Sequence, residues 1–221
     1  MPVPRDRRLL LFTKPAREGR VKTRLIGDLT PAQAAELHAA FLDDLLARLR
    51  PGLFDLRLAW ALDPREEVPA GPFPGVRQRG EDLGERLFLA LSEAAAESGS
   101  VAALGSDHPT LPLELVHRAF DLLDHGAQVV LGPAEDGGYY LIALRADAVD
   151  RRLFEGIAWS TDRVFPETLA RCRDLGLIVE LLPRASDVDT PDDLRRLAAQ
   201  MTEDDLGCPR TRGLLLAWSR I

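Results

Sequence analysis

The chain has 221 residues, of which 46% are hydrophobic and 29% are charged, so its composition is that of a globular protein and excludes a disordered or fibrous one. Its 28 basic and 35 acidic residues give a net charge of −7, which argues against a protein that coats nucleic acid or an anionic membrane. No uncharged run approaches the ~20 residues of a membrane span and no signal-peptide core is present, so we expect a cytoplasmic protein.

Six short apolar runs, each bounded by Gly, Pro or Asp, predict buried strands. Helical patterns lie between most of these runs, which predicts an α/β fold with a largely parallel sheet and helices on both faces. Only six residues separate the fourth run from the fifth, too few for a helical crossover, so these two strands should be antiparallel and the sheet mixed. The runs are residues 9–13, 56–62, 101–105, 128–132, 139–144 and 177–182.

Capping residues and apolar spacing predict five helices. The first has a clear start, with Thr30 as N-cap and Pro31 at the first helical position. The last opens in the same way with Thr190, and the fourth begins near Ser160, where Pro166 should shorten or kink it. The expected helices are residues 31–50, about 82–98, 113–126, from 160 and from 191.

One domain is expected over residues 1–221, because no repeat, linker or change in composition marks a second domain. Its core should cover about residues 8–197, with the tail from Thr202 packed against it. Cys172 and Cys208 lack metal-ligand spacing and are expected to be small packing residues. The sequence carries no signal for an oligomeric state.

The loop 14–25, directly after the first predicted strand, carries five basic side chains and one acidic side chain. In an open α/β sheet, ligands bind beyond the carboxyl ends of the strands, where this loop starts. Gly19 permits a turn with positive φ, and the cations supply the charge that a polyphosphate needs. The loop has neither the dinucleotide nor the P-loop pattern, and a solvated basic loop is the alternative. Its basic residues are Lys14, Arg17, Arg20, Lys22 and Arg24.

Acidic residues follow two further predicted strands. Asp107 comes directly after the strand 101–105, while Asp187 and Asp189 lie between the last strand and the last helix. If the strands are parallel, these carboxylates reach the same sheet edge as the basic loop. Carboxylate oxygens suit Mg²⁺ or Mn²⁺, so a metal shared by Asp107 and Asp189 is expected, although a capping or turn role fits each residue taken singly. His108 is expected to be a local hydrogen-bonding group.

The turn after the fourth predicted strand places Glu135 and Asp136 before Gly137 and Gly138. Paired glycines permit close approach of a ligand to the backbone, and Asp136 is a candidate to position an acceptor hydroxyl or to act as general base. A plain two-glycine reversal explains the segment equally well.

Six segments, taken together and in order, resemble the DUF2064 family of bacterial proteins, which is classed with the nucleotide-diphospho-sugar transferases of GT-A fold. The resemblance covers about residues 8–197, and it implies a single-domain GT-A fold. The segments are KPAREGRVKTRL at 14–25, QRGEDLGERL at 78–87, GSDHPTL at 105–111, GPAEDGGYYLIAL at 132–144, IAWSTDRVF at 157–165 and SDVDTPDDL at 186–194.

The resemblance also implies roles for individual residues. The first loop would bind the nucleotide phosphates, the segment from residue 78 would contact the base or ribose, and aspartates at two strand ends would hold the metal, although this chain has SDHP in place of a full DxD. The residues are Lys14, Gly19, Lys22 and Arg24 for the phosphates, Gln78, Gly80 and Gly84 for the base or ribose, and Asp107 and Asp189 for the metal, with Asp107 also at the nucleotide.

Three functions are consistent with these residues. The leading expectation is a glycosyltransferase dependent on Mg²⁺ or Mn²⁺, which moves a sugar from a nucleotide-diphosphate donor to a small-molecule acceptor. The alternative is a nucleotidyltransferase of the same fold, in which a phosphorylated acceptor attacks an NTP and pyrophosphate leaves. A non-catalytic nucleotide-binding module is the third. The expected catalytic residues are Lys22, Arg24 and Asp136, and the acceptor is expected at Asp136, Gly137, Gly138, Trp159 and Ser160.

Overall fold

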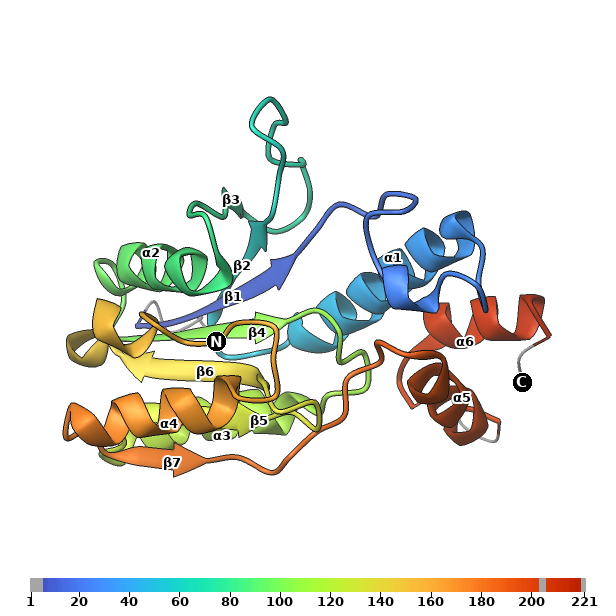
Figure 1. Cartoon of the computed structure of the whole chain (residues 1–221). Helices are drawn as coiled ribbons and strands as arrows, with labels where there is room; N and C mark the ends of the chain where they lie inside the picture. The colour runs from blue at the N-terminus through green and yellow to red at the C-terminus, as the bar shows by residue number, and fades with distance from the viewer. Residues whose placement is uncertain (1–5, 203–205, 220–221) are drawn as a thin grey trace.

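The computed structural model describes residues 6–202 and 206–219, which are built around a seven-stranded mixed sheet (Figure 1). The strand order is β3-β2-β1-β4-β6-β5-β7, and among the described strands only β6 runs antiparallel to its neighbours. The strands are β1 (Arg7–Thr13), β2 (Asp55–Trp60), β3 (Gly75–Arg77), β4 (Ser100–Gly105), β5 (Val129–Pro133), β6 (Tyr139–Arg145) and β7 (Val179–Leu181).

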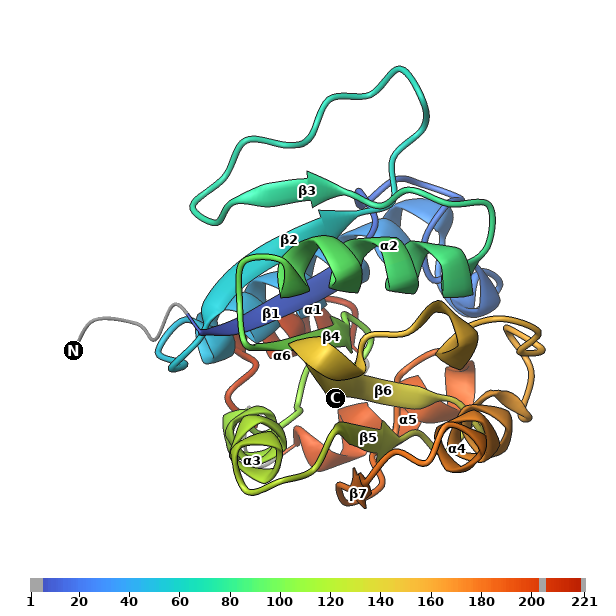
Figure 2. The ribbon, with the colours of Figure 1, turned by 90° about the vertical axis from the view of Figure 1, so that its left-hand side faces the viewer.

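Helices cover both faces of the sheet, as Figure 2 shows. On one face α1 and α3 bury Leu45 and Phe120 against the strands, and on the other α2 and α4 bury Leu91 and Cys172. A third apolar cluster joins α1, α5 and α6. The helices are α1 (Pro31–Leu49), α2 (Leu83–Ala95), α3 (Leu113–Asp124), α4 (Val164–Asp174), α5 (Pro191–Gln200) and α6 (Pro209–Ala217).

The predicted α/β class with a mixed, mostly parallel sheet is confirmed. The short turn between β5 and β6 does join antiparallel strands, with Leu131 opposite Ile142. The predicted caps of α1 and α5 are also present, since Thr30 and Thr190 each accept a hydrogen bond from the third residue of the helix that follows. Residues 1–5, 203–205 and 220–221 of the predicted domain lie outside the described part of the chain.

Three elements differ from the predictions. Strand β3 was not expected, and the tail forms a helix, α6, for which no boundaries were predicted. Helix α4 begins at Val164 and not near Ser160, whose φ of 63° lies in the left-handed region. Pro166 does not kink α4, because it occupies the first turn, where its missing N–H would have no partner within the helix.

A buried carboxylate ties α6 to α1. Asp44 accepts hydrogen bonds from the backbone N–H of Arg210 (3.0 Å) and of Thr211 (2.8 Å), and from the Thr211 hydroxyl (2.7 Å). These backbone donors belong to the first turn of α6, where the helix dipole favours an anion. The tail is therefore anchored by a charge as well as by apolar packing.

We expect Asp44→Ala to lower the free energy of unfolding by about 2–4 kcal/mol, because it leaves buried donors without an acceptor. Asp43→Ala is the matched control: Asp43 is the preceding residue, its side chain is 57% exposed, and its Arg210 partner is 4.0 Å away. The control should change stability by less than about 1 kcal/mol. Urea unfolding of both variants measures the difference, and equal losses would contradict the anchoring role.

None of the helices within residues 6–202 and 206–219 combines the length and apolar character that crossing a bilayer requires.

Candidate functional site

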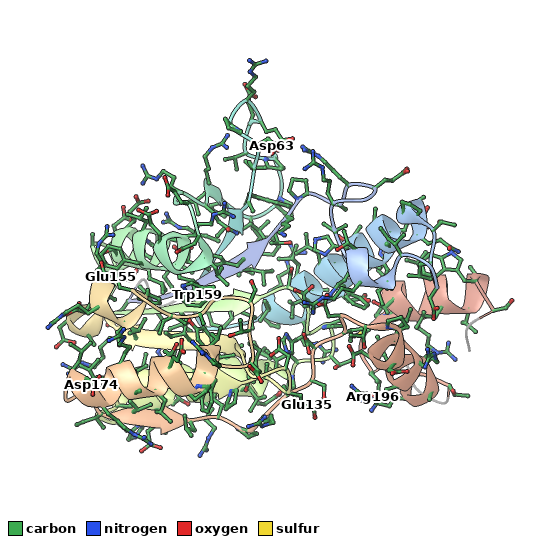
Figure 3. The ribbon with its side chains drawn as sticks, in the orientation of Figure 1. Asp63, Glu135, Glu155, Trp159, Asp174 and Arg196 are labelled. Carbon is green, nitrogen blue, oxygen red and sulfur yellow. The ribbon has the colours of Figure 1, made fainter. Side chains whose placement is uncertain are left out.

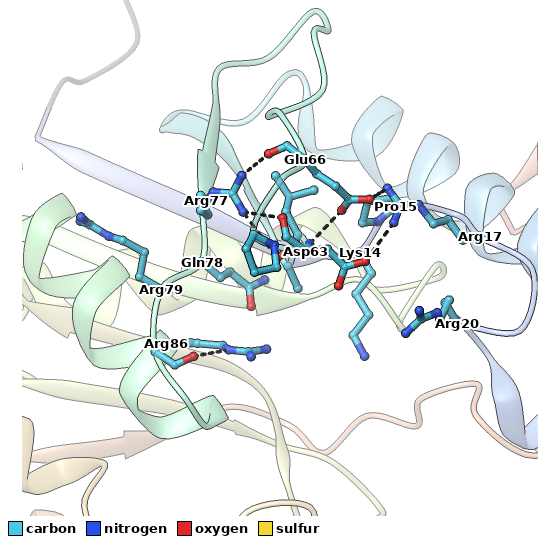
Figure 4. A pocket seen from close by; sticks show the side chains of 14 residues that line it. Lys14, Pro15, Arg17, Arg20, Asp63, Glu66, Arg77, Gln78, Arg79 and Arg86 are labelled. Atoms are coloured by element: carbon cyan, nitrogen blue, oxygen red, sulfur yellow. Dashed lines mark hydrogen bonds and ion pairs between the residues drawn. The ribbon is translucent and has the colours of Figure 1, made fainter.

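Two adjoining cavities lie at the carboxyl edge of the parallel strands. The inner cavity, of about 550 Å³, lies beyond β1 and β4 and includes Asp107 and Asp189 in its lining. The outer cavity, of about 590 Å³, lies beyond β2 and β3 (Figure 4). The two share part of their lining and so can hold different parts of one extended ligand. The shared residues are Lys14, Arg20, Ala61, Gln78 and Arg86.

Lys22 lines the inner cavity. It adopts a left-handed conformation (φ 47°, ψ 38°), which is unfavourable for a residue with a Cβ and is maintained by the contacts of its side chain. That side chain is only 2% exposed, and its Nζ lies 5.3 Å from the centre of the Phe41 ring. The ammonium donates to Asp107 Oδ1 and to the Val188 carbonyl oxygen (2.7 Å).

Asp107 and Asp189 converge on this ammonium from distant parts of the chain. Asp107 follows β4 and Asp189 precedes α5, and a backbone hydrogen bond from Val188 N to Asp107 O (3.1 Å) joins the two segments. Asp189 Oδ1 is 4.0 Å from Lys22 Nζ, and its other oxygen accepts from Arg24 (2.8 Å). Burial raises the pKa of Asp107, but the Lys22 ammonium outweighs it and holds that pKa below its ordinary value. The Asp107 carboxylate is therefore charged at neutral pH.

This pair fits the coordination of a magnesium or manganese ion. No cluster of three or more His, Cys, Asp or Glu side chains suited to a metal occurs in the described part of the chain, so a dedicated protein cage is not present there. Mg²⁺, however, is ordinarily held by one or two carboxylates together with substrate phosphates and water. Asp107, which is 46% exposed, and Asp189 supply such a pair beside the cationic loop.

The start of the basic loop is fixed by neutral groups. His38 Nε2 lies 3.0 Å from the Lys14 carbonyl oxygen and 3.4 Å from the Thr13 hydroxyl, and burial lowers the pKa of His38, so the ring stays uncharged. Gln78 donates from its side-chain amide to Ala59 O (2.8 Å) and to Thr13 O (3.4 Å). Both side chains hold the strand ends in place.

Two residues predicted to contact ligands pack against each other. A Cβ on Gly84 would lie 2.4 Å from the Trp159 indole nitrogen, so Gly84 is required for close packing of α2 against the segment that carries Trp159. Trp159 also meets the Tyr139 ring edge-on, at 6.4 Å between centroids, and Figure 3 shows it between the helices and the sheet. Neither residue is part of the lining of the inner or the outer cavity.

The glycine pair of the β5–β6 turn shapes the turn itself. Asp136 accepts a hydrogen bond from Gly138 N (2.8 Å), and Gly137 has a φ of 90°. A Cβ on Gly137 would lie 2.4 Å from the Asp162 backbone, so the close approach is to the chain and not to a cavity. Of the expected acceptor residues, Ser160 lines the inner cavity.

A separate acidic cavity of about 360 Å³ lies next to this turn, lined by His108, Glu135 and Asp187 among others. Burial, with the nearby Asp136 carboxylate second, raises the pKa of Asp187 to about 6. Burial also lowers the pKa of His108 to about 4, so its ring is neutral. Neither ring nitrogen of His108 has a hydrogen-bond partner among the described residues, so the local hydrogen bond expected for it is not found.

The remaining predicted nucleotide residues, Gly19 and Gly80, lie in backbone turns near the cavities. Gly19 has a φ of 69° in the basic loop, and Gly80 has a φ of 127° and lines the outer cavity. Sequence reasoning did not assign Arg86, which lines both cavities and donates to Gly80 O (3.0 Å). Its place in the first turn of α2, inside the segment 78–87, was the available signal.

Comparisons with known proteins show that the chain is similar to transferases. The family model described as "Uncharacterized protein conserved in bacteria (DUF2064)" matches residues 52–161. A provisionally named nucleotide-diphospho-sugar transferase from Desulfovibrio desulfuricans G20 has a solved structure that is similar at a TM-score of 0.91 and 33% identity, over 97% of this chain and 95% of that one.

Two nucleotide-using enzymes are also similar. A 3-phospho-D-glycerate guanylyltransferase from Phenylobacterium zucineum (strain HLK1) is 29% identical over 186 residues, which are 80% of this chain and 84% of the relative. CMP:2-keto-3-deoxy-manno-octonic acid synthetase, solved in complex with CTP, shares the fold at a TM-score of 0.57 and 16% identity, over 90% of this chain and 99% of that one. Nucleotidyl transfer is thus better supported by the relatives than the glycosyl transfer expected first.

Proposed function

We propose that the chain, which belongs to the DUF2064 family, is a nucleotidyltransferase. It would join the nucleoside monophosphate part of an NTP to a phosphorylated small-molecule acceptor and release pyrophosphate. One observation carries the proposal: the buried Lys22 ammonium lies between Asp107 and Asp189 in a cavity that also carries Lys14, Arg20, Arg24 and Arg86. Five cations in one cavity suit the charge of a triphosphate.

The chain's own residues neutralise and orient the phosphates. An acceptor phosphate oxygen attacks the α-phosphorus in line with the departing pyrophosphate, and Lys22, Arg20 and Arg24 offset the charge that builds up on the leaving oxygens. Asp107 and Asp189 would hold Mg²⁺ or Mn²⁺, which supplies Lewis-acid polarisation of the phosphoryl oxygens. Lys22 donates to Asp107 and lies 4.0 Å from Asp189, so it keeps both carboxylates in place. No general base is required, because the attacking phosphate oxygen is already ionised at neutral pH.

Glycosyl transfer is the second candidate, favoured by the name of the D. desulfuricans relative. Its donor is a nucleotide-diphosphate sugar, and the same cations would neutralise the charge of the diphosphate. The acceptor for either reaction would enter near Ser160 and the turn that carries Asp136.

Two measurements test the proposal, one of nucleotide binding and one of the product released. We expect nucleotides to stabilise the protein only with Mg²⁺ or Mn²⁺, by about 2.7 kcal/mol at a concentration 100 times the Kd, as a thermal-shift titration measures. With an NTP and a panel of phosphorylated acids, pyrophosphate should be released. Release of free nucleoside diphosphate from nucleotide sugars would favour glycosyl transfer, and binding without either product would favour a non-catalytic module.

A further inference from the structure

The loop from Ala61 to Pro74, which joins β2 to β3, forms one wall of the outer cavity and is held in a defined conformation (Figure 4). Arg77 donates to the Asp63 carbonyl oxygen (3.0 Å) and to that of Glu66. Glu66 in turn accepts from Asp63 N (2.9 Å) and pairs with Arg17. The Asp63 side chain is thus presented by a fixed backbone.

Three of the cations line the outer cavity and not the inner one, and these three already have partners, so they are not free to bind a second polyphosphate. Arg77 is engaged by carbonyl oxygens, Arg17 is paired with Glu66, and Arg79 is paired with Glu93. The phosphates of a nucleotide would therefore lie in the inner cavity. The adjoining outer cavity is left for the base.

Two polar side chains of the outer cavity, Asp63 and Gln78, offer hydrogen-bond acceptors to a base. The Asp63 side chain is 63% exposed, and the ion pair from Arg17 to its carboxylate is long, at 3.5 Å. The amide nitrogen of Gln78 donates to two backbone carbonyls. The side-chain oxygen, which is an acceptor, is therefore the atom left for a ligand. Pro15 and Pro64 add apolar surface against which a ring can pack.

We infer that the outer cavity binds guanine and that the Asp63 carboxylate recognises its N1–H and 2-amino group; the inference rests on the proposed nucleotidyl transfer. Guanine presents two adjacent donors that one carboxylate accepts together. Cytosine and adenine each place a ring-nitrogen acceptor beside their single amino group, and uracil places carbonyl oxygens on both sides of its N–H. A carboxylate facing those edges repels them.

The inference is tested by binding of GDP, IDP, XDP, CDP, ADP and UDP with Mg²⁺, measured by calorimetry on the wild type and on Asp63→Asn. IDP lacks the 2-amino group, and XDP replaces it with a carbonyl. We expect the wild type to bind GDP at least about tenfold more tightly than IDP and each of the other nucleotides. In Asp63→Asn the preference for GDP over IDP should be lost and affinity for XDP should rise, because an amide N–H matches the added carbonyl.

Glu67→Gln is the matched control, since Glu67 is an exposed acid on the same loop and lines neither cavity. It should keep the wild-type order of affinities. Equal binding of GDP and CDP by the wild type, or an unchanged ratio of GDP to IDP affinity in Asp63→Asn, would overturn the inference. Pyrophosphate released from CTP but not from GTP would overturn guanine recognition and leave nucleotidyl transfer standing. A guanine preference without any turnover would support guanine recognition and contradict nucleotidyl transfer.

Discussion

Replacing Lys22 with methionine is expected to reduce kcat/KM for pyrophosphate release by about 10²–10³-fold. Removing one preorganised charged donor from a site of this kind has an effect of that order. The ammonium also keeps Asp107 and Asp189 together, at 4.0 Å from the latter, so the two carboxylates would repel each other in its absence. Steady-state kinetics over a range of NTP concentrations measure the loss.

Methionine is chosen because it fills the space of the lysine stem against Phe41 without a charge. Lys22→Arg should restore little activity, since a planar guanidinium does not fit a buried site shaped for a point charge. A circular dichroism melt checks that both variants are folded. Full activity in folded Lys22→Met would show that the ammonium is not at the reacting phosphates.

The second large effect is expected for Asp107→Asn, which should abolish the Mg²⁺-dependent part of nucleotide binding and lower turnover by about 10³-fold. The amide has nearly the same shape and can still accept from Lys22, so the fold should be retained. Thermal shift with nucleotide, measured with Mg²⁺ and again with EDTA, separates metal-dependent stabilisation from the rest.

Asp174→Asn serves as the control for Asp107→Asn, because Asp174 is exposed at the end of α4, far from both cavities (Figure 3). It should behave as the wild type in both assays. If Asp107→Asn binds nucleotide with the same response to EDTA as the wild type, Asp107 does not hold the metal.

The sequence was informative where local rules determine structure. The six-residue turn before Tyr139 excluded a helical crossover, and Thr30 and Thr190 marked helix starts by their capping chemistry. The position of Asp107 at a strand end predicted its place at the carboxyl edge, because parallel strands bring their ends together.

Local rules do not predict contacts between segments that are distant in the sequence. The packing of Gly84 on Trp159 joins positions that no local pattern relates, so the glycine was assigned to nucleotide binding. Strand β3 has three residues within a segment rich in Pro and Gly, too short to show a period. The role we infer for Asp63 depends on Arg77 and Arg17 holding the loop, which only the folded chain reveals.

Helix α1 connects the tail to the cleft. Asp44 binds the start of α6, while Phe41 and His38, earlier on the same helix, contact Lys22 and the Lys14 backbone. The stretch of α1 from His38 to Asp44 thus contacts both the basic loop and the start of α6. Local unfolding of α6 would be transmitted to the loop, so α6 contributes to the preorganisation of the candidate site.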